Sequence, residues 1–80
     1  MHIKDAIVAR IKEICSQRSI KYNELATLAG VTPSTVYSMM DDNRRDLSVS
    51  TVKKMCDGLG IGIPDFFASD IFQDLEQEIK

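Results

Sequence analysis

Apolar residues recur every three or four positions in the first part of the chain and predict an amphipathic helix over residues 3–18. Its apolar face is made of Ile3, Ile7, Val8, Ile11, Ile14 and Cys15. Its basic residues, which we expect to lie off that face, are Lys4, Arg10, Lys12 and Arg18. The helix therefore buries one side against the rest of the protein.

Two shorter helices are predicted over residues 22–29 and from residue 33 to about residue 40. Gly30 is placed to end the first of them, because glycine readily adopts the left-handed conformation found after many helices. Thr32 is expected to cap the second, and Pro33 stands at its first position, where a missing N–H costs nothing. The inward residues of the two helices are Leu25, Ala26, Ala29, Val36, Met39 and Met40.

A polar loop over residues 41–46 leads to a fourth helix over about residues 49–58, with Ser48 as its N-cap. The apolar face of this helix is made of Val49, Val52, Met55 and Cys56. The glycines that mark its exit are Gly58, Gly60 and Gly62. The short fifth helix that follows is opened by Pro64 and contains Phe66 and Phe67.

The last stretch of the chain alternates apolar residues with acids and predicts a short amphipathic helix within residues 70–80. Its apolar residues lie four apart at Ile71, Leu75 and Ile79. Nothing in the chain alternates with period two, so we predict an all-α fold without a sheet. We divide the chain into a domain over residues 1–68 and a C-terminal amphipathic extension over residues 69–80.

The composition, 44% hydrophobic over 80 residues, suits one small globular domain. No apolar run approaches the roughly 18–20 residues of a membrane span and no signal peptide is evident, so we expect a soluble, cytoplasmic protein. Cys15 and Cys56 have apolar neighbours and no CxxC spacing, which favours reduced, buried thiols over a disulfide or a metal site. With no phosphate loop, nucleophile–base set or metal cluster, we expect no enzyme, no cofactor and no small-molecule ligand.

The most informative segment is residues 22–39, where two short helices are joined by a glycine-containing turn. Ala26 stands where the helices cross closely, and Val31 and Val36 hold them apart at a fixed angle. Such a pair offers its second helix to the major groove of DNA.

This segment resembles the phage repressor/Cro-like (XRE) helix-turn-helix family. The resemblance rests on ELA at residues 24–26, AGVTPSTV at residues 29–36 and SVSTVKKMCDGLGI at residues 48–61. It extends over about residues 3–67 and implies a compact, five-helix, lambda-repressor-like DNA-binding domain. The implied function is sequence-specific binding of double-stranded DNA by a transcriptional regulator, a repressor on a palindromic operator.

The resemblance also implies a role for each matching position. The positions that face base edges are Thr32, Pro33, Ser34 and Ser38, and their neighbours that touch bases or phosphates are Thr35 and Tyr37. The positions that face phosphates are Lys21, Tyr22, Asn43, Arg44, Arg45, Ser48 and Ser50. Hydroxyl groups both donate and accept hydrogen bonds, so they discriminate bases less sharply than a bidentate side chain.

Two departures from the family pattern affect the contacts. Members commonly have Thr and Gln where this chain has Lys21 and Tyr22, so the helix cap is lost while Lys21 supplies a phosphate charge. Asp41 and Asp42 replace the family's Glu-x-Gly after the recognition helix. These aspartates disfavour phosphate unless they turn away or pair with the arginines of the loop.

Charge is divided unevenly along the chain, although the net charge is only −2. Residues 1–54 hold nine Lys and Arg against six Asp and Glu, whereas residues 55–80 hold Lys80 against six acids. DNA affinity depends on charge placed where phosphates lie. The acidic end should therefore face away from DNA.

Several assignments stay open. Tyr37 contacts the groove or packs at the domain edge, while the methionines are read as core residues rather than a peptide-binding surface. The apolar series from Phe66 to Ile79 covers the core or forms a homodimer interface, which would pair two recognition helices about 34 Å apart. The rival function is a protein-interaction module, such as an antitoxin-like or anti-repressor partner.

Overall fold

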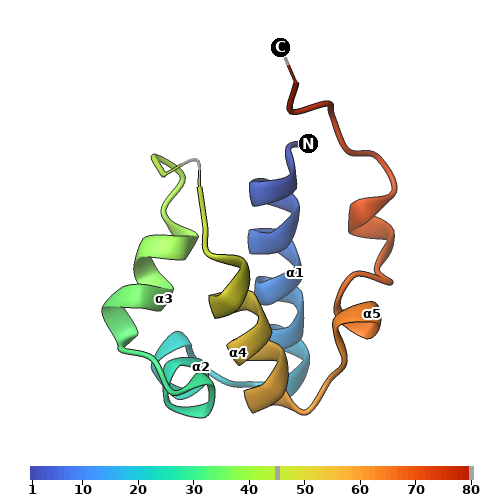
Figure 1. The fold of residues 1–80 in the computed structure, drawn as a ribbon. Coiled ribbons are helices and arrows are strands. Elements are labelled where there is room, and N and C mark those ends of the chain that lie inside the picture. Colours follow the sequence, from blue (N-terminus) through green and yellow to red (C-terminus); the bar gives the residue numbers. More distant parts are fainter. Residues whose placement is uncertain (45, 80) are drawn as a thin grey trace.

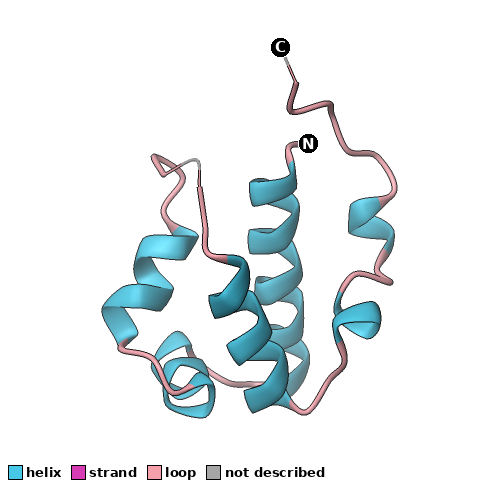
Figure 2. Cartoon of the chain, viewed as in Figure 1, coloured by secondary structure: helices cyan, strands magenta, loops and turns pink. Residues whose placement is uncertain are grey.

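The computed structural model describes residues 1–44 and 46–79, and all regular structure in these ranges is helical (Figures 1 and 2). The elements are α1 (Ile3–Arg18), α2 (Tyr22–Ala29), α3 (Pro33–Met40), α4 (Val49–Leu59), α5 (Ile63–Phe66) and the 3-10 turn η1 (Asp70–Phe72). In Figure 1, α1 and α4 occupy the centre, α2 and α3 lie on one side, and α5 and η1 lie on the other. The predicted all-α fold is confirmed, as are the bounds of the first three helices.

The core is built from the apolar faces that the sequence pattern predicts, except that Val49, predicted on the apolar face of the fourth helix, is 80% exposed at the first position of α4. Phe66, Leu25, Val36, Met55 and Cys56 are fully buried. The other residues of this cluster are Ile7, Ile11, Ile14, Cys15, Ala26, Ala29, Met39, Val52 and Leu59. The interpretation of the methionines as core residues is therefore confirmed, with Met40 partly buried against the same cluster. Cys15 and Cys56 are free, and burial raises the pKa of both thiols, so they stay protonated at neutral pH.

The backbones of α4 and α2 approach each other closely at Gly58. A Cβ on Gly58 would lie 2.3 Å from the backbone oxygen of Leu28, which is shorter than any real contact. Of the glycines predicted to mark the exit of the fourth helix, Gly60 is confirmed, since it follows the last helical residue Leu59 with φ +71°, whereas Gly58 lies inside α4. Gly58 instead allows two helix backbones to touch.

Three basic side chains of α1 hold the ends of other helices. Lys4 Nζ donates to the carbonyl oxygen of Asp41 at the end of α3, at 2.5 Å. Arg18 Nη1 donates to Leu59 at the end of α4, at 2.6 Å, and Arg10 Nε donates to Phe66 at the end of α5, at 2.8 Å. Terminal carbonyl groups have no partner within their own helix and favour a nearby cation.

This arrangement corrects the expectation that Lys4 lies off the buried face of the first helix. Its side chain is only 3% exposed. The long apolar stem packs inside while the ammonium group donates to the Asp41 carbonyl oxygen, which also accepts from the backbone N–H of Arg44 at 3.1 Å.

The prediction of a helix within residues 70–80 is wrong over the described part of that stretch. Only η1 is helical there, and residues 73–79 are irregular. The backbone N–H of Glu76 donates to the carbonyl oxygen of Met1 at 3.0 Å, and the Glu78 carboxylate accepts from the N–H of Ile3 and from His2. The tail therefore runs along the start of α1, where a carboxylate is favoured by the helix dipole.

None of the helices in the described residues is long and apolar enough to cross a membrane.

Candidate nucleic-acid interface

The outer face of α3 carries short hydroxyl side chains fixed by a cap at its first turn. Thr32 Oγ1 accepts from the backbone N–H of Thr35 at 3.3 Å, which confirms the predicted N-cap. The same oxygen lies 3.0 Å from both the Ser34 and the Thr35 hydroxyl oxygens. Because Val36 and Met39 are buried on the opposite side, α3 is anchored with this polar face turned outward.

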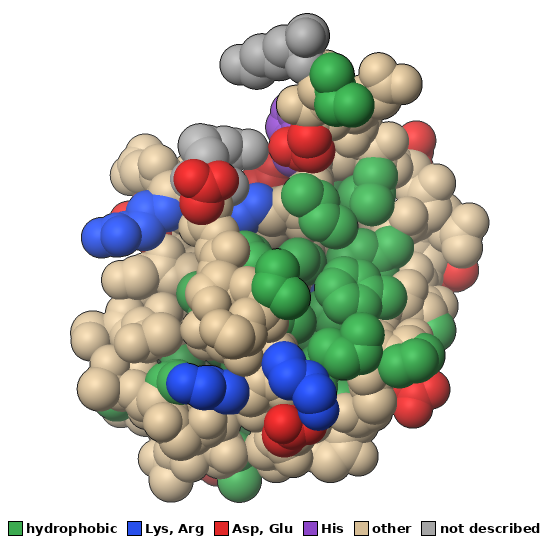
Figure 3. Space-filling model, viewed as in Figure 1, with side chains coloured by type: hydrophobic (Ala, Val, Ile, Leu, Met, Phe, Trp, Pro, Cys, Tyr) green, Lys and Arg blue, Asp and Glu red, His purple; other side chains and the backbone are tan. Residues whose placement is uncertain are grey.

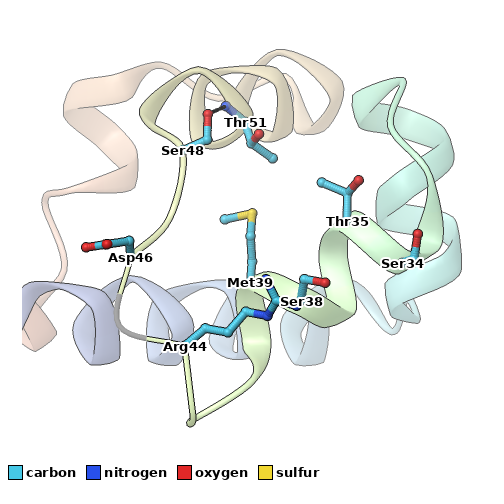
Figure 4. Close-up of a pocket in the computed structure, with 8 residues that line it drawn as sticks. All are labelled: Ser34, Thr35, Ser38, Met39, Arg44, Asp46, Ser48 and Thr51. Atoms are coloured by element: carbon cyan, nitrogen blue, oxygen red, sulfur yellow. Dashed lines mark hydrogen bonds between the residues drawn. The ribbon is translucent and has the colours of Figure 1, made fainter.

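A hollow of about 270 Å³ separates α3 from the start of α4 (Figure 4). Its polar walls are made of Ser34, Thr35, Ser38, Arg44, Asp46, Ser48 and Thr51, and Met39 also lines it. Ser48 caps α4 by accepting from the N–H of Thr51 at 3.3 Å and lies 2.8 Å from the Ser50 hydroxyl. Hydroxyl groups and the first N–H groups of a helix can all donate to a phosphate oxygen.

The loop after α3 places one arginine in this hollow and uses an aspartate for its own turn. Asp41 Oδ1 accepts from the N–H of Asn43 at 2.9 Å, so this carboxylate is engaged within the loop. In Figure 4 the side chain of Arg44 runs toward Ser38, whereas the carboxylate of Asp46 points away from the hollow. Arg45, also predicted to contact phosphate, lies outside the described residues.

A second hollow of about 330 Å³ flanks the other side of α3 and is lined by Ile20, Lys21, Tyr22 and Tyr37. The two tyrosine rings meet edge to face with centroids 5.5 Å apart. Burial, followed by the nearby Cys15 and Tyr37, raises the pKa of Tyr22, so its phenol stays a hydrogen-bond donor at neutral pH. Tyr37 is 54% exposed and thus both packs on Tyr22 and presents a free edge.

The start of α2 lacks a side-chain cap, as the sequence predicts from the presence of Lys21. The N-cap residue Lys21 makes no capping hydrogen bond, and its side chain is exposed beside the second hollow. A cation at this position can contribute charge to a phosphate without being held by the helix terminus.

The first hollow brings together five of the predicted contact residues, Ser34, Thr35, Ser38, Arg44 and Ser48, and the second brings together Lys21, Tyr22 and Tyr37. Thr32, Pro33, Asn43 and Ser50 line neither hollow, and Arg45 lies outside the described residues. Pro33, Ser34 and Tyr37 are exposed on the helix itself. Sequence reasoning missed Asp46 and Thr51, which line the first hollow. Thr51 lies three residues after its N-cap, a spacing that places it at the mouth of the helix, and this signal could have identified it.

The surface around α3 can therefore contact nucleic acid in two ways. Short hydroxyl side chains project from α3, where they can reach base edges. Arg44 on one side and Lys21 on the other lie where each can meet one sugar–phosphate strand.

The comparisons with known proteins agree with this geometry. The model of the Cro/C1-type HTH DNA-binding domain matches residues 10–69, which include α2, α3 and α4. No curated protein and no solved structure matches the chain. Since the matched segment covers most of the sequence, the chain belongs to the Cro/C1-type helix-turn-helix family of DNA-binding domains.

Proposed function

We propose that the protein represses transcription by binding a specific palindromic DNA site with α3 in the major groove. The observation that supports this most strongly is the placement of Arg44 and Lys21 in hollows on opposite sides of a hydroxyl-bearing helix. A basic group on each side matches the two phosphate strands that border a groove.

In this proposal the contacts divide by chemistry. Base edges are read by Thr32, Pro33, Ser34 and Ser38, with Thr35 and Tyr37 as neighbours that reach bases or sugars. Phosphates are held by Lys21, Tyr22, Asn43, Arg44 and Arg45 and by the start of α4 at Ser48 and Ser50. Each hydroxyl contact discriminates only modestly between bases, so sequence specificity arises from several such contacts together.

Two copies are proposed to occupy the two halves of the site in the cytoplasm. Two-fold related recognition helices about 34 Å apart meet the major groove on one face of the duplex. Residues 1–68 form the DNA-binding domain in this account, and residues 69–80 form an extension that stays off the DNA.

Selection from random duplex DNA tests this function. We expect enrichment of one two-fold symmetric sequence, and Ser34→Ala should change the preferred bases without abolishing binding. Affinity for the selected duplex should fall with salt at a logarithmic slope of about −0.9 per phosphate contact. No enriched sequence together with no binding at low salt would overturn the proposal.

A further inference from the structure

An apolar surface extends from the start of α4 across α1 to the C-terminal segment. We define this apolar face as Ile3, Leu47, Val49, Phe67, Phe72 and Leu75. Figure 3 shows hydrophobic side chains gathered in one continuous area of this side of the molecule, between α4 and the C-terminal segment. A small domain rarely leaves such an area open unless another molecule covers it.

Part of this face is hollowed. A depression of about 230 Å³ lies between α1 and the start of α4 and is lined by Ile3, Ile7, Leu47 and Val49, with Lys4, Asp46 and Glu78 around them. Val49 is 80% exposed although it begins a helix, so its side chain contributes little to the core. The depression is shaped to receive apolar side chains from outside.

The aromatic part of the face continues from this depression. The rings of Phe67 and Phe72 have centroids 4.9 Å apart, and both contact Phe66 beneath them. Phe67 is 36% exposed and Leu75 is 39% exposed. The core is thus already closed by Phe66, and the outer residues remain available for a partner.

Acidic residues dominate the surroundings of the face. The carboxylates that line the depression belong to Asp46 and Glu78, and those close in sequence to Phe67, Phe72 and Leu75 belong to Asp65, Asp70, Asp74 and Glu76. The nearby cations already have partners within the chain, since Lys4 is buried against a carbonyl oxygen and Arg10 is bound to Glu13 and Phe66. The amino terminus likewise contacts Glu76 at 3.0 Å. Glu76 and Glu78 are in turn bound to the amino terminus and to His2, so the negative charge beside the face comes mainly from Asp46, Asp65, Asp70 and Asp74.

We infer that the apolar face docks a basic amphipathic helix of a partner protein. Leucine-type side chains of such a helix would fill the depression and cover Phe67 and Leu75, while its lysines or arginines would meet the carboxylates around them. A second copy of this chain fits poorly, because a two-fold contact places the same acidic residues opposite one another.

This docking surface borders the DNA-binding surface at the start of α4, where Asp46 lines both the depression and the hollow beside α3, and extends from there away from α3. Figure 1 places α3 and the C-terminal segment on opposite sides of α1 and α4. A partner on the apolar face would therefore leave α3 accessible, and the protein would link DNA to a second protein.

Two helical peptides of about 18 residues, long enough to hold a helix on a surface, test the inference. One carries leucines on one face and lysines on the other, and the second replaces every lysine with glutamate. In fluorescence anisotropy titrations we expect the lysine peptide to bind the full-length protein at least about tenfold more tightly, with affinity falling as salt rises.

Leu75→Ser and the control Leu28→Ser locate the binding site. Leu28 is 49% exposed on α2, outside the face, so both variants remove an exposed leucine. We expect Leu75→Ser to weaken peptide binding about tenfold and Leu28→Ser to leave it unchanged. Val49→Ser gives a second test within the face that does not depend on the fold tolerating a change at Leu75.

Three results would overturn the inference. Equal affinity for the two peptides would show that charge does not determine binding. Equal effects of Leu75→Ser and Leu28→Ser on peptide affinity would show that the peptide does not bind at the apolar face. A wild-type dimer in sedimentation equilibrium that Leu75→Ser converts to monomer would assign the face to a second copy. DNA binding by Leu75→Ser is expected to be unchanged, so failure here is distinguishable from failure of the proposed DNA-binding function.

Discussion

The α3 surface and the apolar face differ in almost every property, although they share one small core. The α3 surface combines exposed hydroxyl groups with Arg44 and Lys21, whereas the apolar face combines exposed hydrophobic residues with acids. The net charge of −2 does not reveal that basic and acidic side chains lie on different surfaces. A binding surface is therefore identified by where charge lies in the fold, and the sum over the chain says little about it.

The two surfaces also differ in how they are held. The α3 surface depends on long-range bonds from α1, notably from Lys4 to the loop that carries Arg44. The apolar face depends on the tail, whose residues contact the start of α1 through Glu76 and Glu78. Changes at these supports should affect the two surfaces separately, while changes in the common core should affect both.

The largest effect is expected from Gly58→Ala, which should disrupt both surfaces together. The added Cβ meets the backbone of α2, which cannot move without opening the core, so we expect a loss of about 3 kcal/mol in unfolding free energy. Urea unfolding measures this loss. In the control Gly62→Ala the new Cβ has only ordinary contacts, the nearest at 3.5 Å, and should cost less than about 1 kcal/mol. Equal costs would show that the crossing of α2 and α4 is not tight.

Lys4→Met should act next most strongly and mainly on the α3 surface. Removing the ammonium takes away the side-chain donor of the Asp41 carbonyl oxygen, which keeps only the backbone N–H of Arg44 at 3.1 Å. We therefore expect a loss of about 1 kcal/mol of stability and a looser loop around Arg44. Urea unfolding and DNA titration check the two effects. Lys12→Met removes the same charge from an exposed position of α1, and a similar loss in that control would refute the supporting role of Lys4.

Arg44→Ala should weaken DNA binding without altering the fold or the apolar face. One phosphate contact is lost, so all duplex sequences should be bound more weakly and the salt slope should decrease in magnitude by about 0.9. Replacement of both arginines, with Arg45→Ala added, should enlarge the effect. Lys12→Ala serves as the control, because it makes the same change in net charge at a residue outside both hollows. An equal loss of DNA affinity in this control would show that the loop does not contact DNA.

The smallest effect concerns the tail and its dependence on pH. A hydrogen bond from the amino terminus and the positive charge of that group lower the pKa of Glu76 from its usual 4.5. Because the folded pKa is the lower one, the stabilisation is present above pH 4.5 and is lost as pH falls through the folded value. Glu76→Gln should therefore reduce stability at neutral pH, and its difference from wild type should vanish in acid.

Urea unfolding between about pH 3 and pH 6 measures this difference. Glu24→Gln removes an exposed carboxylate from α2 and serves as the control. If the two variants respond to pH alike, the contact between Glu76 and the amino terminus does not hold the tail.

The sequence predicts well those features that neighbouring residues decide. Thr32, Pro33 and Gly30 set the bounds of α2 and α3 through capping and backbone preference alone, and the structure has these bounds as predicted. The apolar spacing of α1 likewise identifies the part of the core that this helix supplies, Ile7, Ile11, Ile14 and Cys15. The hydroxyl-bearing face of α3 follows directly, since the positions opposite its buried residues must face outward.

Features that depend on contacts between residues far apart in the sequence cannot be predicted in this way. The carbonyl oxygens bound by Lys4, Arg18 and Arg10 lie 37, 41 and 56 residues further along the chain. Gly58 has the local appearance of a helix end, although its role is to admit the backbone of α2. The tail has helical spacing, yet its groups bond to the start of α1 instead. Tertiary contacts decided each of these cases.

Backbone NMR of the isotope-labelled protein titrated with duplex DNA tests the central claim most directly. We expect saturable shifts in the amides of residues 32, 34–38, 43–44 and 48–50, and none in residues 67–79. Shifts concentrated in residues 67–79, or no saturable shift at low salt, would contradict the assignment of α3 as the DNA-reading helix.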